Sequence, residues 1–313
     1  MANEYYTTTN DLTKVAEAIR TKGQTSAQLV FPLGYVSAIE NLSWSPTAST
    51  LPVYTYANGT HTLIDEGNGN WRLILTTTGT LNFSHLATSV DVFIAGGGGG
   101  GGAASQSWEY CGGGGGGGGR TYSHTNLLVN KNQDYSIVIG AGGASSYSGG
   151  TTSAFGYSAA GGDGASIANG GDGGSGGGAG GYSTVAVGGK GGTCGGNGEK
   201  THTLTTMSAG AGQGSNTYAF GTDTSKAYCA GGGGGGGISS NGETAGGGSG
   251  GSYGGGKGAG TAGISYSTGS NGRDAEASTG SGGGGALGWS SGTQNSAGGK
   301  GGSGVVIIRN ARY

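Results

Sequence analysis

Two unbroken runs of glycine, residues 96–102 and 112–119, constrain the fold of this chain more than any other feature. Glycine has no side chain to place in a hydrophobic core. It also loses more backbone entropy on folding than other residues, which lose roughly 1–2 kcal/mol each. The runs are therefore either flexible spacers or part of a structure that only glycine can build.

Glycine-rich runs recur after residue 95, and between them lie short segments with Tyr, Trp, Thr and Ser. The runs are 96–102, 112–119, 170–181, 188–196, 231–237, 246–260 and 282–285, several of them interrupted. Glycine supplies 83 of 313 residues, but proline only 3, so the chain is not collagen. With 10% charged residues and a net charge of -2, it also lacks the charge that keeps disordered chains solvated.

Repetition of similar run lengths favours an ordered structure. In the extended left-handed helix with three residues per turn, backbone N–H and C=O groups point outward and have no partner within the helix. Glycine lets such helices approach until these groups pair between neighbours, and eight residues span roughly 25 Å at about 3.1 Å per residue. The sequence therefore predicts a packed slab of polyglycine II helices with loops at both ends. Flexible Gly-rich linkers are the alternative.

Residues 1–45 have an ordinary composition and the apolar spacing of two amphipathic helices. We predict a small helical hairpin that attaches the chain to a larger assembly, followed by a linker over residues 46–52. Short helices of this length are marginal in water alone, so the module is expected to dock on other protein. Its expected packing residues are Leu12, Val15, Ile19, Phe31, Val36 and Ile39.

Residues 53–95 predict an antiparallel β-module, with turn signals at Asn58–Gly59 and in the segment 65–70. Trp71, Leu73 and Leu75 alternate toward one face. A strongly apolar strand over residues 304–310 follows the last glycine run, and we expect it to pair with the early strands. The glycine-rich domain, residues 96–303, is then one insertion between paired strands. The predicted class is mainly β and polyglycine II.

Several functional classes lack support in the sequence. The 14 Lys and Arg residues form no basic stripe for nucleic acid, and no apolar stretch is long enough for membrane insertion. Histidine, cysteine and serine show no metal or nucleophile spacing, so we expect no enzyme, cofactor or metal. A repeat over residues 161–178 resembles a calcium-binding nonapeptide, but Ser166 and Ser175 stand where the motif needs aspartate. We interpret Asp163 and Asp172 as turn residues.

Aromatic side chains between the glycine runs are the candidate contact residues. Tyr and Trp offer a large contact area at low entropic cost, with a polar tip. The alternative is that they pack against the edges of the slab. The candidates are Trp108, Tyr110, Tyr147, Tyr218, Phe220, Tyr266 and Trp289. Lysines in three GGK segments, Lys190, Lys257 and Lys300, are either a basic rim or exposed charges that hinder self-association.

The sequence "DVFIAGGGGGGG", the repeated glycine runs, "YSIVIGAGG" and "GGSGVVIIR" resemble the glycine-rich domains of bacteriophage tail-fibre and minor virion proteins. They are similar to tail-tip adhesins that form polyglycine II sandwiches. The segment "ANEYYTTTNDLTKVAEAIRTKG" with "FPLGYVSAI" looks like an N-terminal module of phage tail proteins from Gram-positive hosts.

This resemblance implies a virion protein, made in the host cytoplasm and released by lysis, whose loops bind a glycan or protein of the host cell surface. Its other implied partners are tail proteins and further copies of itself in a homo-oligomer. Two alternatives stay open. One is a structural decoration fibre of the head or tail without a specific receptor, and the other is a bacterial matrix fibre.

Overall fold

The structure is a computed structural model that describes residues 51–85, 89–104, 112–181, 186–192, 197–200, 209–212, 217–221, 226–237, 250, 271–288 and 296–311. The helical module predicted for residues 1–45 lies outside these residues, together with its six packing positions. The described residues form antiparallel strands and extended glycine-rich segments, with one short 3-10 turn in this part of the chain. The prediction of a mainly β fold is confirmed.

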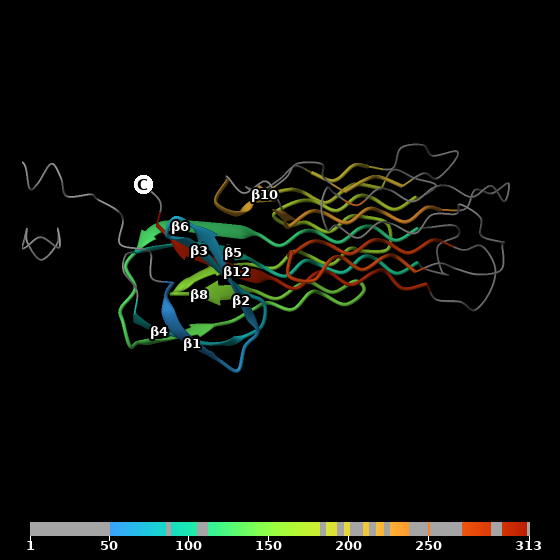
Figure 1. The fold of residues 1–313 in the computed structure, drawn as a ribbon. Helices are drawn as coiled ribbons and strands as arrows, with labels where there is room; N and C mark the ends of the chain where they lie inside the picture. The colour runs from blue at the N-terminus through green and yellow to red at the C-terminus, as the bar shows by residue number, and fades with distance from the viewer. Residues whose placement is uncertain are drawn as a thin grey trace, which may run out of the picture. The chain divides into compact units, whose positions relative to one another are not determined.

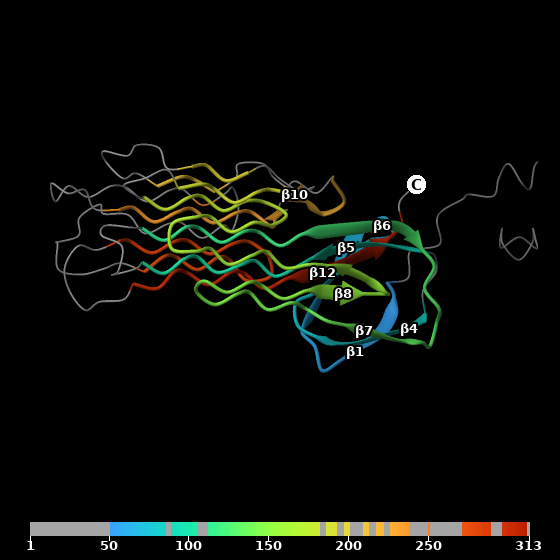
Figure 2. The same ribbon diagram turned by 180° about the vertical axis from the view of Figure 1, so that it is seen from behind.

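Strands gather at one end of the region from residue 51 onward, and the glycine-rich segments run side by side away from them (Figures 1 and 2). The larger sheet has the order β2(His61–Gly67), β3(Asn70–Leu75), β12(Val305–Asn310), β5(Val90–Ala95) and β6(Thr121–Leu127). The smaller sheet has the order β1(Val53–Ala57), β4(Gly79–His85) and β7(Asp134–Ile137). Two short hairpins are β8(Thr152–Ala154) with β9(Tyr157–Ala159) and β10(Thr217–Tyr218) with β11(Ala227–Tyr228).

The strand β12 lies between β3 and β5 and pairs antiparallel with both. Val306 is opposite Leu75 on one side and Ile94 on the other. Because β5 leads into the glycine run at residue 96 and β12 follows the last glycine-rich segment, the sheet holds both ends of the glycine-rich region together.

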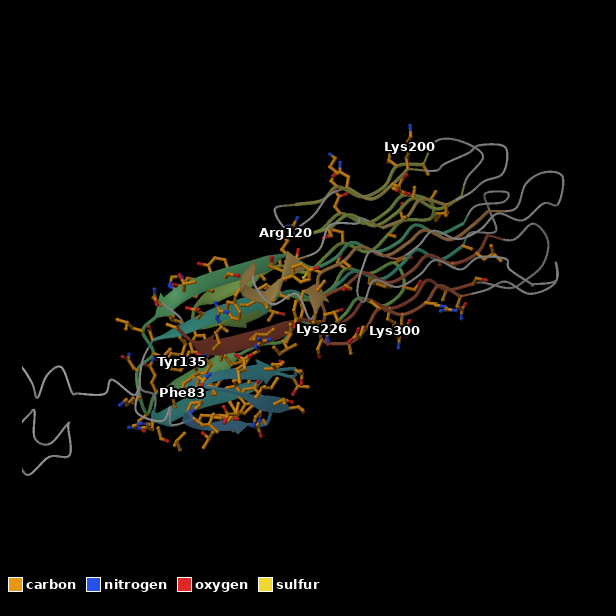
Figure 3. The ribbon with its side chains drawn as sticks, turned by 45° about the horizontal axis from the view of Figure 1, so that its top comes forward. Phe83, Arg120, Tyr135, Lys200, Lys226 and Lys300 are labelled. Atoms are coloured by element: carbon orange, nitrogen blue, oxygen red, sulfur yellow. The ribbon has the colours of Figure 1, made fainter. Side chains whose placement is uncertain are left out.

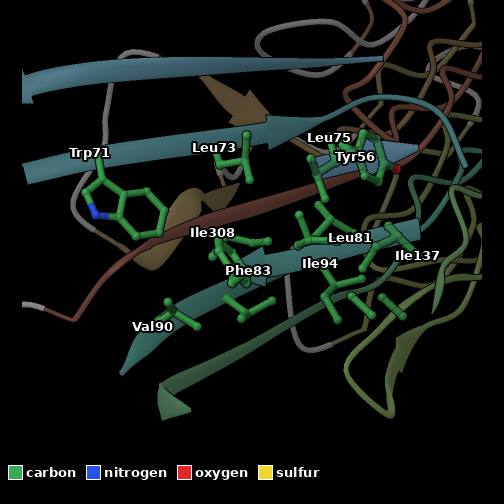
Figure 4. Close-up of a cluster of buried hydrophobic side chains, with 14 residues drawn as sticks. Tyr56, Trp71, Leu73, Leu75, Leu81, Phe83, Val90, Ile94, Ile137 and Ile308 are labelled. Carbon is green, nitrogen blue, oxygen red and sulfur yellow. The ribbon is translucent and has the colours of Figure 1, made fainter. Parts of the chain in front are cut away.

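The main hydrophobic core lies between the two larger sheets (Figure 4). The alternation of β3 directs Trp71, Leu73 and Leu75 to this side, where Leu73 and Leu75 are 0% exposed. Leu81 and Phe83 of β4 meet them from the smaller sheet. The other face of the larger sheet has a second apolar cluster, which includes Phe93, Ala95, Ala219, Tyr228, Cys229, Val305 and Ile307.

The first glycine run, residues 96–102, donates its N–H groups to three segments in strict rotation. The acceptor carbonyls, in order from Gly96 to Gly102, belong to Arg120, Gly150, Gly302, Gly117, Tyr147, Gly299 and Gly114. Every third N–H therefore reaches the same neighbour. Its carbonyls accept from three further segments, through the N–H groups of Gly162, Ala165, Gly143, Ser146, Gly283 and Ala286. The run thus has six hydrogen-bonded neighbours.

The second unbroken run, residues 112–119, is surrounded in the same way. Its N–H groups and that of Arg120 donate in rotation to the carbonyls of Gly181, Ala286, Ser166, Gly178, Gly283, Asp163, Ser175, Gly280 and Ala160. Its carbonyls accept from the first run, from residues 171–174 and from residues 232–235. All glycines of both runs are buried. These two runs, which lack any side chain, are therefore interior segments of this packing.

Close backbone contact explains why these positions are glycine. A Cβ atom added at Gly116 would clash with the carbonyl oxygen of Gly99, and one at Gly99 would clash with that of Asp163. Neither obstacle is a side chain that could rotate away. Segments at the outside of the packing instead carry exposed side chains at intervals, such as Asp163, Lys190 and Lys300. Figure 3 shows the side chains crowded around the sheets and sparse along the glycine-rich segments.

Candidate functional site

The predicted contact residues Trp108, Tyr110, Tyr266 and Trp289 lie outside the described residues. Residues 104 and 112 flank the stretch that contains Trp108 and Tyr110, residues 250 and 271 flank the stretch that contains Tyr266, and residue 288 precedes Trp289. The structure places the other three candidates, Tyr147, Tyr218 and Phe220.

Tyr147 lies on a tight turn that joins two outer glycine-rich segments. Its side chain is 71% exposed. Its backbone is held on both sides, since its N–H donates to the Ala144 carbonyl and its carbonyl accepts from Gly100 N–H. Ser146, the preceding residue, has a φ of 66°. The turn therefore presents an aromatic ring to solvent from a fixed backbone, which is the arrangement a contact residue requires.

Phe220 instead packs against the larger sheet. It lies in the 3-10 turn η1(Ala219–Gly221), with its ring centroid 6.1 Å from that of Phe93. The Arg309 guanidinium lies 4.0 Å from the centroid of the Phe220 ring, which is a cation–π contact. Arg309 also bonds to the buried carboxylate of Asp91, with 3.0 Å between Nε and Oδ2. Phe220 thus fastens its segment to the sheet, and Tyr218, on the adjoining β10, is half-buried.

A group of half-buried aromatic residues on the sheets was not among the predicted contact residues. The Tyr157 ring stacks on Tyr122 at 4.9 Å and on His124 at 4.8 Å between centroids. Phe155 packs against Tyr135 at 4.9 Å. The β8–β9 hairpin brings these pairs together because Phe155 and Gly156 both take positive φ, as a two-residue hairpin turn requires. The sequence signal is the Phe-Gly-Tyr turn at 155–157 together with the alternation of Tyr122 and His124.

Burial also determines the chemistry of Tyr56. Its ring is packed beside Gly59 and Gly79, where an added Cβ would overlap the ring, and its hydroxyl donates to the Thr77 carbonyl. Burial raises the pKa of Tyr56 to about 12 and also raises the pKa of Tyr54. Because His61 contacts both rings, this cluster is a packing feature of the β1–β2 end.

The aspartates of the nonapeptide repeat have protein partners. The Asp163 carboxylate accepts from the Ser148 hydroxyl at 3.4 Å, and the Asp172 carboxylate accepts from the Lys190 N–H at 2.6 Å. Among the described residues, no group of three His, Cys, Asp or Glu side chains could hold a metal ion. No helix in the same residues is long and apolar enough to cross a membrane.

The described lysines of the GGK segments, Lys190 and Lys300, are exposed on outer segments, and Lys257 lies outside the described residues. Figure 3 shows Lys300 directed away from the packed segments. Exposure fits both the rim interpretation and the interpretation that these charges hinder self-association.

A sequence profile described as a glycine-rich domain matches residues 76–311. The chain belongs to this glycine-rich domain family. The matched region begins before β4 and ends after β12, so it contains flanking strands as well as the glycine-rich segments. No curated protein sequence matches the chain.

Proposed function

We propose that the protein is a virion-associated tail-fibre adhesin whose glycine-rich domain presents loops to a receptor on the host cell surface. In this proposal the glycine-rich segments are polyglycine II helices packed into a rigid slab. Residues 1–45 attach the chain to other tail proteins as a helical hairpin, and the assembled fibre is a homo-oligomer. The receptor is a glycan or a protein.

One observation carries the proposal: successive N–H groups of residues 96–102 bond to three neighbouring segments in rotation, so that every third N–H reaches the same segment. A period of three residues per turn is the hallmark of the polyglycine II helix. None of these glycines is among the described positive-φ residues, which fits one uniform handedness along the run. The resulting packing leaves the connections between segments as the places where variable side chains can lie.

A rigid support makes loop-borne recognition efficient. Ordering a loop on binding costs affinity, and a fixed backbone removes part of this cost before the partner arrives. Tyr147 illustrates the principle, because its backbone is hydrogen-bonded on both sides while its ring is 71% exposed. The remaining aromatic candidates, Trp108, Tyr110, Tyr266 and Trp289, are proposed to contact the receptor in the same manner.

Cell binding by the full chain tests the proposal. Labelled protein is titrated against a panel of Gram-positive cells, with heat-denatured protein as the control for adhesion by unfolded chains. We expect saturable binding to a few strains that is lost on heating. Absence of saturable binding to the strains infected by the virion that carries this protein would contradict the proposal.

Loop variants then locate the contact. Three loop variants are compared with one control. The loop variants are Trp108→Ala with Tyr110→Ala, Tyr147→Ala alone, and Tyr266→Ala with Trp289→Ala. The control is Leu128→Ala, which alters an apolar side chain that is 84% exposed on the sheet region. At least one loop variant should lose binding while the Leu128 variant retains it. If every loop variant binds normally, these aromatic residues are not the contact. Copies of the protein are then counted along imaged particles, and many copies along the particle would identify a structural fibre.

A further inference from the structure

Two outer segments of the glycine-rich region accept N–H groups of a neighbouring segment with side-chain oxygens and not with backbone carbonyls. Asn169 and Asp172 are three residues apart and exposed or half-exposed. The Asn169 side-chain oxygen accepts from Val187 N–H at 3.1 Å, and the Asp172 carboxylate accepts from Lys190 N–H at 2.6 Å. The two donors are also three residues apart.

The same arrangement occurs a second time with other segments. The Asn271 side-chain oxygen accepts from Ala297 N–H at 2.9 Å, and the Asp274 carboxylate accepts from Lys300 N–H at 2.7 Å. The sequences also match, since Asn-Gly-x-Asp faces Val-Gly-Gly-Lys at one place and Ala-Gly-Gly-Lys at the other. Two independent pairs with the same sequence and bonding argue against coincidence.

The spacing of these bonds is that of the glycine packing. Inside it, N–H groups three residues apart donate to one neighbouring segment, as Gly112 and Gly115 do to Gly181 and Gly178. In the outer pairs, side-chain oxygens take the place of the carbonyls of such a neighbour. All four donor residues, Val187, Lys190, Ala297 and Lys300, are exposed. Solvent therefore lies where the next segment would otherwise pack.

Without these side chains, a row of N–H groups would face solvent from a glycine-rich surface. Such a row attracts another chain for the same reason as an unpaired sheet edge. We propose that the two Asn-Gly-x-Asp segments are lateral stops, which end the glycine packing and prevent glycine-rich segments of a second copy from adding to it. This inference does not depend on the proposed receptor function.

Substitution by glycine tests the stops, because glycine fits the extended backbone and removes the side-chain acceptor. The variant Asn169→Gly, Asp172→Gly, Asn271→Gly, Asp274→Gly is compared with the full wild-type chain by sedimentation velocity over a concentration series. We expect the variant to lose the wild-type species to larger assemblies as the concentration rises, while the wild type keeps its sedimentation coefficient.

Charge is the essential control. The glycine variant removes two negative charges, and the net charge changes from -2 to -2 + 2 = 0. The variant Asp172→Asn, Asp274→Asn has the same net charge but keeps every side-chain oxygen. It should sediment as the wild type does. Equal association of both variants would overturn the proposal, since loss of charge alone would then be the cause. Wild-type sedimentation of the glycine variant would overturn it as well.

Each pair is also removed separately, with circular dichroism as the check of folding. The two double variants are Asn169→Gly with Asp172→Gly, and Asn271→Gly with Asp274→Gly. Each should remain folded and associate less than the variant with all four changes. Unfolding of both double variants would overturn the proposal, because it would show that these side chains hold the fold together instead of ending its packing.

Discussion

The sheets and the glycine-rich segments bury their backbones by opposite means. In the sheets, hydrogen bonds join strands within a layer, and side chains such as Leu73 and Phe83 fill the space between layers. In the glycine runs 96–102 and 112–119, hydrogen bonds leave each segment in several directions and the runs have no side chains of their own. In the first region a smaller side chain leaves a cavity, whereas in the second a Cβ added at an interior glycine such as Gly116 would overlap the backbone of a neighbouring segment. The two regions should therefore respond differently to mutation.

The largest effect is expected from a methyl group added inside the glycine packing. Gly116→Ala places a Cβ against the carbonyl oxygen of Gly99, and rigid backbone surrounds the site. We expect destabilisation of about 5 kcal/mol or more, beyond ordinary point mutations. Chemical denaturation of wild type and variant measures it. Gly192→Ala is the control, because its nearest obstacle, the Gly173 carbonyl oxygen, is 3.0 Å from the added Cβ. Equal effects at both sites would refute tight interior packing.

Truncation in the sheet core should cost less. Leu73 is 0% exposed, and Leu73→Ala leaves a cavity that neighbouring side chains fill only in part. We expect a loss of about 3 kcal/mol in the free energy of unfolding, within the range for buried leucines. Leu128→Ala, at a position that is 84% exposed, should change it little. A larger loss for Leu73→Ala than for Gly116→Ala would reverse the comparison of the two regions.

Alkaline pH should weaken the sheet region through Tyr56. Burial raises its pKa from 10.0 to about 12, so the folded state disfavours the phenolate. The stabilisation is complete below pH 10 and is lost as the pH rises through 12. Unfolding measured across this range should show a fall in stability that Tyr56→Phe reduces. Part of the fall should persist because the pKa of Tyr54 is also raised. Tyr147→Phe is the control. An equal reduction of the fall in stability in that variant would contradict the assignment of the fall to Tyr56.

The smallest effect on stability is expected from the exposed ring of Tyr147. Tyr147→Ala removes a side chain that is 71% exposed, while the N–H and carbonyl of Tyr147 that hold the turn belong to the backbone and are kept. The free energy of unfolding should change by less than about 0.5 kcal/mol, as for other surface substitutions. Thermal denaturation measures this change. A large loss would show that outer side chains support the glycine packing after all.

Sequence patterns were sufficient for some features because they reflect local geometry. The alternation of Trp71, Leu73 and Leu75 predicts a strand with one buried face, and all three are buried. The apolar run at 304–310 likewise predicts a strand. The role of Phe220 could not be read in this way. Its contact partners, Phe93 and Arg309, are far away in the sequence, so an aromatic residue between glycine runs looked equally suited to a loop contact.

The sequence by itself determined that residues 96–102 and 112–119 either remain unpacked or pack through their backbones, because they have no side chains. Only the tertiary structure decided which neighbours they have. Gly96 bonds to Arg120, Gly97 to Gly150 and Gly98 to Gly302, yet nothing in seven identical residues encodes these choices. Glycine contributes hydrogen bonds without partner specificity. The strands β5, β6 and β12, which continue directly from the glycine-rich segments and do have distinctive side chains, fix which segments begin side by side.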